Sequence, residues 1–231
     1  MVYMPIFLDL ARRRCVVVGG GEVAARKTRS LLEANADVTV VSPEADADLH
    51  VLADAGAITH YQRRYAAGDL AGAILVYAAT GDSAVNAEVA TEGRARGLLV
   101  NVVDTPELCN FISPAVVRRG AMQLAISTSG RSPALARILR AQLESSIGPE
   151  YALLTEMLGA ARRRLKNLEP DLARRAHIIS AMLAAGLREA IAKDDRAAID
   201  AILLTHLGVR WSELDIPNGA PDASADTPTA R

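Results

Sequence analysis

The sequence predicts an α/β protein in which a doubly wound parallel sheet is followed by a small α+β region and a helical carboxy-terminal region. Up to Val103, short valine-rich apolar runs alternate with longer stretches rich in Ala, Leu, Glu and Arg. This alternation is typical of parallel strands joined by crossover helices. After Asp104 the pattern changes to two short strands around a turn, and from Glu150 onward helix-forming residues dominate.

The elements of the sheet follow from this pattern in chain order. A continuous apolar run bounded by turn residues is typical of a strand buried on both faces, and Cys15-Val16-Val17-Val18 before a glycine cluster is the clearest example. The predicted strands are 15–18, 36–41, 56–61, 73–79 and 98–103. The predicted helices between them are 22–34, 46–55 and 83–96, with Ser83 as the cap of the last.

The elements after the sheet are of a different kind. Two strands, 115–118 and 121–127, are expected to pair around the turn Arg119-Gly120. A helix over 134–145 is expected to begin near Pro133, because proline suits the first helical turn. Further helices are expected between Glu150 and Leu207, with breaks at Glu169-Pro170 and near Gly186.

The composition excludes several functional classes. Lys and Arg number 26 and Asp and Glu 27, so the net charge of −1 provides no global attraction for nucleic acid or an anionic membrane. Aromatic residues make up only 3%, which also argues against stacking on bases. No apolar run approaches the roughly 18 residues of a membrane-spanning helix, and Asp9 interrupts any signal-peptide core. We therefore expect a cytoplasmic protein without nucleic-acid or membrane partners.

Cysteine and histidine provide no evidence for a bound metal. Cys15 and Cys109 are the two cysteines, too few for a disulfide framework or a metal cluster. The four histidines lack the spacing of metal ligands, so each is expected to be structural or exposed. We therefore expect no metal ion held by the protein itself.

The segment Gly19-Gly20-Gly21-Glu22-Val23-Ala24 matches the pattern G-x-G-x-x-A between a predicted strand and a predicted helix. In a Rossmann-type sheet the first glycine permits the tight turn, and the third lets a pyrophosphate approach the backbone. The helix amino terminus then faces the phosphates. A plain turn has the same composition, but the strand–turn–helix context favours dinucleotide binding.

The second predicted strand bears on the choice between NAD and NADP. An acidic residue usually ends this strand and binds the ribose, whereas Val41 is followed by Ser42-Pro43-Glu44. Ser42 and Glu44 are candidates for the ribose contact, and this turn has no arginine for a 2′-phosphate, so NAD is favoured. Thr80, after the strand over 73–79, is expected to line the same cleft.

Asp104 ends the predicted strand over 98–103 at the mouth of this cleft. By itself, such an aspartate is more often a turn or helix cap than an acid/base group. The polar segments Asn110–Pro114 and Ser127–Pro133 supply hydroxyls, amides and Arg131, which suit a ligand with several carboxylates. Further arginines of the same region are Arg118, Arg119, Arg137 and Arg140, each of which could equally be a solvated surface residue.

Five segments occur together in a specific order and spacing. They are Pro5-Ile6-Phe7, 17–27, Asn101-Val102-Val103-Asp104, Phe111-Ile112-Ser113-Pro114 and 129–136. Over residues 1–165 this set resembles the precorrin-2 dehydrogenase family, which forms the amino-terminal module of siroheme synthase. The resemblance implies NAD-dependent oxidation of precorrin-2 to sirohydrochlorin in a homodimer. In many members the same cleft inserts ferrous iron as well, to give siroheme.

The resemblance also implies roles for individual residues. Asp104 matches the catalytic aspartate, and Glu22, Val23, Pro43 and Glu44 match positions beside NAD. Thr128 falls where some members carry a serine that can be phosphorylated. The candidate cofactor-binding residues are Gly19, Gly21, Glu22, Val23, Ser42, Pro43, Glu44 and Thr80. The candidate substrate-binding residues are Asn101, Phe111, Ser113, Thr128, Ser129, Gly130, Arg131 and Ser132.

The expected domains are a nucleotide-binding domain over 1–113, a dimerisation region over 114–147, a helical domain over 148–216 and a disordered tail over 217–231. Two alternatives remain open at this point. One is a dehydrogenase that leaves iron insertion to another protein. The other is a domain that senses NAD without chemistry, which would need neither Asp104 nor the polar loop that contains Arg131.

Overall fold

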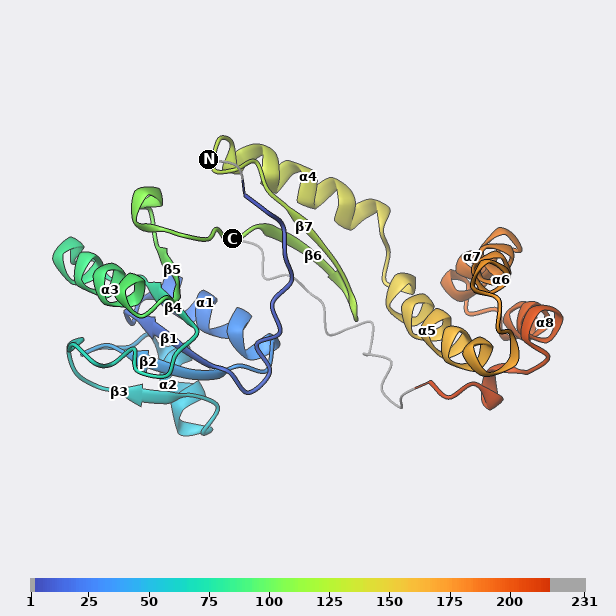
Figure 1. Cartoon of the computed structure of the whole chain (residues 1–231), viewed down its shortest axis with the longest axis horizontal. Coiled ribbons are helices and arrows are strands. Elements are labelled where there is room, and N and C mark those ends of the chain that lie inside the picture. Colours follow the sequence, from blue (N-terminus) through green and yellow to red (C-terminus); the bar gives the residue numbers. More distant parts are fainter. Residues whose placement is uncertain (1–2, 217–231) are drawn as a thin grey trace. The chain divides into compact units, whose positions relative to one another are not determined.

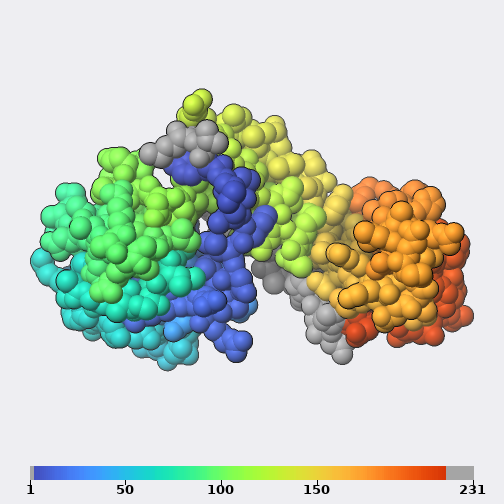
Figure 2. Space-filling model, viewed as in Figure 1, coloured from blue at the N-terminus to red at the C-terminus, as the bar shows by residue number. Residues whose placement is uncertain are grey.

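The computed structural model describes residues 3–216, and the tail predicted over 217–231 lies outside the described residues. The chain divides into two compact units, Met1–Ser113 and Pro114–Arg231. Within the described part, no helix is long and apolar enough to cross a membrane. The amino-terminal segment of the first unit carries exposed apolar side chains, with Met4 79%, Ile6 58% and Phe7 71% exposed (dark blue in Figure 2).

The first unit contains the predicted parallel sheet of five strands, in the order β3-β2-β1-β4-β5 (Figure 1). The strands are β1 (Arg14–Val18), β2 (Asp37–Val41), β3 (Thr59–Tyr61), β4 (Leu75–Ala78) and β5 (Leu99–Val102). The chain proceeds outward from β1 to β3 and then returns to the other side of β1 as β4. The strand order therefore reverses between β1 and β4, where doubly wound sheets bind their ligands.

Helices cover both faces of this sheet. Helices α1 (Glu22–Glu33) and α2 (Ala47–Asp54) bury Ala24 and Leu49 against one face, together with Val17 and Val38. Helix α3 (Ser83–Ala95) packs on the other face. Valines of β1 alternate between the two apolar clusters, which is why the strand is a continuous apolar run. The predicted α/β fold class is confirmed.

Two local features of the first unit differ from expectation. The cap of α3 is Asp82 and not Ser83: the Asp82 carboxylate accepts the backbone N–H groups of Ala84 and Val85. Asp and Ser are both good caps, so composition alone did not distinguish the two neighbours. A short 3₁₀ helix, η1 (Pro106–Leu108), was also not predicted and follows Asp104.

The second unit begins with the predicted hairpin. Strands β6 (Ala115–Arg119) and β7 (Met122–Ile126) pair antiparallel around Gly120, whose φ is +56°. Helix α4 (Pro133–Ser146) packs on both strands and begins at Pro133 as expected. Ser132 caps this helix, because its hydroxyl accepts the backbone N–H of Leu135.

Between Glu150 and Ile216 the second unit is helical, and its helices share one apolar core (orange to red in Figure 2). It comprises α5 (Glu150–Leu168), α6 (Leu172–Ala184), α7 (Leu187–Ala192), α8 (Arg196–Leu207) and the short η2 (Trp211–Glu213). Its core includes the fully buried Met157, Met182 and Leu203. The break between α7 and α8 was not predicted. It occurs where Asp194 has a φ of +50° and Asp195 caps α8.

Candidate functional site

The ends of β1 and β4 meet at the point where the strand order reverses. Val18 and Ala78 are partners in the parallel register, and Gly19 follows Val18 with a φ of +128°. A Cβ on Gly19 would lie 2.3 Å from the carbonyl oxygen of Ala79. Only glycine permits both this φ and this contact, so Gly19 closes the turn as predicted.

The next two glycines have different surroundings. A Cβ on Gly20 would lie 1.8 Å from the carbonyl oxygen of Glu44, so the chain after β2 lies directly against this residue. A Cβ on Gly21 would meet nothing within 4 Å. Gly21 is the N-cap of α1 in extended conformation, without a side-chain hydrogen bond to the first helical turn. No side-chain cap engages the first turn of α1, so its backbone N–H groups are available to an anionic ligand.

The residues after β2 separate into a buried and an exposed group. Ser42 is only 2% exposed, and its hydroxyl lies 3.0 Å from the Nε2 atom of His60. Pro43 and Glu44 are exposed beside the glycine loop. Thus Glu44 is available to a bound ribose, whereas the Ser42 hydroxyl lies beneath the loop in contact with His60.

Thr80 lies on the other side of the glycine loop. Its hydroxyl contacts the Oδ1 atom of Asn86 at 2.8 Å, and the Asn86 amide donates to the carbonyl oxygen of Thr80 at 3.1 Å. Asn86 is buried and was not identified from the sequence. Its side chain holds the turn after β4 in place.

A second cluster lies toward β5 and contains three of the candidate substrate residues. The Tyr77 and Ser113 hydroxyls are 2.9 Å apart, and the rings of Tyr77 and Phe111 meet edge to face at 5.6 Å. The Asn101 amide donates to the carbonyl oxygen of Phe111 at 3.0 Å. Asn101 is also the register partner of Tyr77. The structure therefore brings Asn101, Phe111 and Ser113 together around Tyr77. The sequence had not indicated a role for Tyr77.

Lys27 of α1 belongs to this cluster as well. Its ammonium lies 4.9 Å from the centroid of the Tyr77 ring. Burial, and secondarily the neighbouring charge of Arg26, lowers the pKa of Lys27. Burial raises the pKa of Tyr77, with the Ser113 hydrogen bond acting in the opposite direction. The motif over 17–27 contained Lys27, but nothing in the sequence indicated which side chain it would contact.

Asp104 lies two residues beyond the end of β5 and is exposed. Its φ of +58° is in the left-handed region, which for a residue other than glycine costs on the order of 1 kcal/mol and is common at functional sites. Thr105, not Asp104, is the N-cap of η1. Within residues 3–216, no hydrogen bond or ion pair engages the Asp104 carboxylate, so the alternative of a capping residue receives no support.

The polar loop before α4 belongs to the second unit. Ser129 and Gly130 have φ values of +52° and +77°, and the Thr128 hydroxyl accepts the backbone N–H of Ser132 at 3.1 Å. Arg131 is exposed. The loop is therefore a closed turn in which Arg131 is exposed and the Thr128 hydroxyl accepts one internal hydrogen bond.

Two of the arginines considered for carboxylates have internal partners. Arg119 donates to the carbonyl oxygens of Glu144 and Ile147 at the carboxyl end of α4, at 2.9 and 2.8 Å. Arg140 forms an ion pair with Glu144 at 2.7 Å. Both guanidinium groups stabilise the second unit itself, and the sequence did not reveal these partners because they depend on packing.

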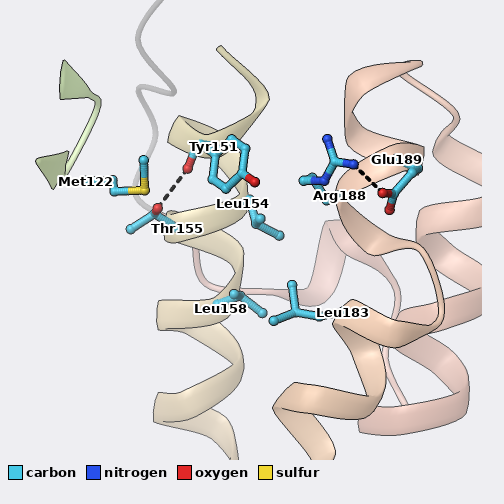
Figure 3. Close-up of a pocket in the computed structure, with 8 residues that line it drawn as sticks. All are labelled: Met122, Tyr151, Leu154, Thr155, Leu158, Leu183, Arg188 and Glu189. Carbon is cyan, nitrogen blue, oxygen red and sulfur yellow. Dashed lines mark hydrogen bonds and ion pairs between the residues drawn. The ribbon is translucent and has the colours of Figure 1, made fainter. Parts of the chain in front are cut away.

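The second unit also contains a depression of about 430 Å³ (Figure 3). Leu154, Leu158 and Leu183 form its apolar part, and Arg188 contacts Glu189 at its rim (Figure 3). None of the candidate site residues lines it. Among the residues that the structure describes, no group of three or more His, Cys, Asp or Glu side chains is placed to hold a metal ion.

Comparison with known proteins identifies two matching families and several similar proteins. A family described as putative NAD(P)-binding matches residues 6–115, and one described as sirohaem biosynthesis protein central matches residues 119–146. Siroheme synthase of Chromobacterium violaceum is 43% identical over 201 residues, which is 87% of this chain and 43% of the relative. Siroheme synthase of Pseudomonas aeruginosa is 40% identical over 207 residues, which is 90% of this chain and 44% of the relative.

A comparison of folds also finds a protein of tetrapyrrole biosynthesis. A solved structure described as SirC, precorrin-2 dehydrogenase, matches with a TM-score of 0.72 and 28% identity, over 87% of this chain and 98% of that one. The chain spans less than half the length of the siroheme synthases that it matches. Residues 6–115 thus match the putative NAD(P)-binding family and residues 119–146 the sirohaem biosynthesis protein central family, and the fold is similar to that of the SirC structure.

Proposed function

We propose that the chain catalyses the NAD-dependent oxidation of precorrin-2 to sirohydrochlorin. The observation that carries the proposal is the exposed carboxylate of Asp104, whose backbone has a left-handed φ and follows β5. Strand β1 of the same sheet is followed by the open glycine turn. The names of the relatives, siroheme synthase and precorrin-2 dehydrogenase, support the choice of substrate. The two alternatives, a dehydrogenase without chelatase activity and a non-catalytic NAD sensor, are separated by experiment below.

The residues around the glycine turn fit a dinucleotide. Gly21 leaves space where a Cβ would project, and the first turn of α1 has uncapped backbone donors for a pyrophosphate. Glu44 would bind the ribose hydroxyls, as an acidic residue does at this position in NAD enzymes. Arg63 beyond β3 forms an ion pair with Asp69 at 2.7 Å, so its charge is already neutralised and does not favour the 2′-phosphate of NADP. When bound, NAD supplies the hydride acceptor.

Asp104 would act as the general acid/base group. Oxidation of precorrin-2 removes a hydride and a proton, so one proton must pass to a base while NAD⁺ becomes NADH. An ionised carboxylate without an internal partner can accept that proton and release it to solvent. Asn101, Phe111 and Ser113 of the first unit would bind the tetrapyrrole, and Thr128–Ser132 remain substrate-binding residues predicted from the sequence.

We extend the proposal to iron insertion by the same carboxylate. Binding of Fe²⁺ by sirohydrochlorin releases two pyrrole protons, which Asp104 would accept in turn. The ferrous ion is here a substrate, since the macrocycle supplies the nitrogen ligands. The reaction therefore needs no metal cluster made of protein side chains.

The working assembly is proposed to be a homodimer. Large apolar side chains are exposed in both units: Ile6 and Phe7 in the first, and Leu135 and Ile138 in the second, 46% and 54% exposed. Exposed apolar side chains that adjoin one another, as Ile6 and Phe7 do in the chain, are typical of surfaces that contact another chain. Light scattering after gel filtration would measure the oligomeric state.

The test is to mix the protein with precorrin-2, with and without NAD and Fe²⁺, and to follow visible absorption and NADH formation. Sirohydrochlorin formed only with NAD supports the dehydrogenase. A further spectral change on adding Fe²⁺, faster than without protein, supports the chelatase, and its absence supports a dehydrogenase alone. An unchanged spectrum under every condition, with NAD bound, would leave the NAD-sensing alternative.

A further inference from the structure

Lys27 is a partly buried ammonium group without an anionic partner. It lies in the second turn of α1, and its Nζ atom lies over the Tyr77 ring at 4.9 Å from the centroid. Within residues 3–216, neither an ion pair nor a hydrogen bond is formed by this side chain. A desolvated cation is costly unless it is paired, so burial lowers the pKa of Lys27. A cation–π contact compensates only part of this cost.

The neighbouring cations of the same helix are situated differently. Arg29 forms an ion pair with Asp48 of α2, and Arg26 is exposed. Only Lys27 among these three is directed at the aromatic cluster of β4. The Tyr77 ring is itself held by Phe111 at 5.6 Å and by the Ser113 hydroxyl. The Lys27 ammonium therefore lies over the Tyr77 ring and donates no hydrogen bond within residues 3–216.

The position of Lys27 indicates which of two anionic ligands, the dinucleotide or the tetrapyrrole, its ammonium group would contact. A ribose bound at Glu44 would lie beside β2, and the open Gly21 lies at the amino end of α1. Lys27 lies on the opposite side, with Tyr77 of β4 and the candidate substrate residues Phe111 and Ser113. The substrate side of the site is therefore where its charge acts.

We propose that the Lys27 ammonium binds a carboxylate of the tetrapyrrole, and that Tyr77, fixed by Ser113, positions this ammonium. The inference rests on the proposed function and names a substrate-binding residue for it. Arg119 and Arg140, two arginines considered for the substrate carboxylates, already have internal partners, whereas the Lys27 ammonium forms no ion pair within residues 3–216. A charge-assisted hydrogen bond from a partly desolvated ammonium is stronger than one formed in water.

The test measures binding without turnover. The dissociation constant for sirohydrochlorin is determined by absorption titration of the full chain, with NAD and Fe²⁺ omitted. Lys27→Met keeps an unbranched side chain over Tyr77 and removes the charge, so we expect weaker binding by about tenfold. Lys27→Arg restores the charge and should recover most of the affinity. Arg26→Gln is the matched control, since it removes a charge one residue away, and should change the affinity less than about twofold.

Separate measurements distinguish failure of this inference from failure of the proposed function. NAD affinity should be the same in Lys27→Met and the wild type, because the dinucleotide occupies the other side of the site. Equal sirohydrochlorin affinity of Lys27→Met and Arg26→Gln would overturn the inference, and so would a loss confined to NAD binding. If Lys27→Met and Lys27→Gln both fail to fold while Arg26→Gln folds, the lysine serves packing, and the inference is again overturned. Absence of NADH formation by a wild-type protein that binds sirohydrochlorin would instead contradict the proposed function.

Discussion

The hydroxyl groups of Tyr77 and Ser113 lie 2.9 Å apart and join β4 to the last residue of the first unit. The two residues are separated by 36 positions in the chain. Tyr77 is only 8% exposed, so its hydroxyl depends on this partner for a hydrogen bond. The contact ties the segment 109–113 to the sheet at the candidate substrate site.

This contact should contribute measurably to stability. We expect Tyr77→Phe and Ser113→Ala each to lower the free energy of unfolding by about 1 kcal/mol, and the double variant to lose little more than either alone. Urea unfolding of the four proteins measures the coupling. Tyr61→Phe, at a tyrosine that is 39% exposed, is the control and should change stability by less than about 0.5 kcal/mol. Strictly additive losses would contradict the contact.

Alanine substitutions at Gly20 and Gly21 should have different effects, the first on stability and the second on NAD binding. Gly20→Ala places a Cβ 1.8 Å from the carbonyl oxygen of Glu44, so we expect a loss of about 2 kcal/mol or more of stability. Gly21→Ala meets nothing within 4 Å and should leave the melting temperature nearly unchanged. It should nevertheless weaken NAD binding at least tenfold, because the methyl group occupies the space of the pyrophosphate. Thermal melts and NAD titrations of both variants check this, and unchanged NAD affinity in Gly21→Ala would contradict the proposed cofactor position.

Asp104 should be dispensable for folding and necessary for catalysis. Asp104→Gly relieves a left-handed φ of +58°, so its melting temperature should equal or exceed that of the wild type. Asp104→Asn keeps the shape and tolerates this φ. Both variants should bind NAD normally and lose about 10²-fold or more in the rate of NADH formation. Full dehydrogenase and chelatase rates in Asp104→Ala that still binds NAD would refute the assigned role.

The two cysteines should differ in reactivity. Burial raises the pKa of Cys15 to about 11, so little thiolate forms at neutral pH and the side chain is inaccessible. Cys109 is partly exposed. In the native protein, iodoacetamide should label Cys109 first and Cys15 only after unfolding, as mass spectrometry of the digested protein would show. Equal labelling rates under native conditions would be inconsistent with a buried β1.

The ion pair between Arg63 and Asp69 should contribute stability above acidic pH only. The Arg63 guanidinium donates two hydrogen bonds to Asp69, at 2.8 and 2.7 Å, and lowers the pKa of that carboxyl below its ordinary 3.8. A lowered pKa in the folded state means that the contribution is present above the ordinary pKa and lost as pH falls through the lowered one. Because Arg63 is half exposed, we expect Asp69→Asn to cost only about 0.5 kcal/mol at neutral pH. In urea unfolding, the difference between wild type and variant should decrease as the pH falls below 3.8, and a difference that grows toward acid would have the wrong sign.

Local features of this protein were predictable from the sequence. The valine run of β1 and the glycine turn after it are neighbours in the chain, and their geometry depends on backbone sterics and the period of apolar residues. Pro133 marked the start of α4 for the same reason. The break before Asp195 also had a local signal, a helix-capping aspartate, which the composition of the surrounding helices obscured.

Contacts between distant residues were decided by the tertiary structure. The strand order placed Tyr77 beside Asn101, and packing of α1 on that face brought Lys27 over the Tyr77 ring. Packing likewise directed Arg119 to the end of α4 and Ser42 to His60. The sequence by itself determined most of the elements and the glycine turn, because these depend on residues a few positions apart. Which polar side chains remain free for a ligand depends on partners brought together only by folding.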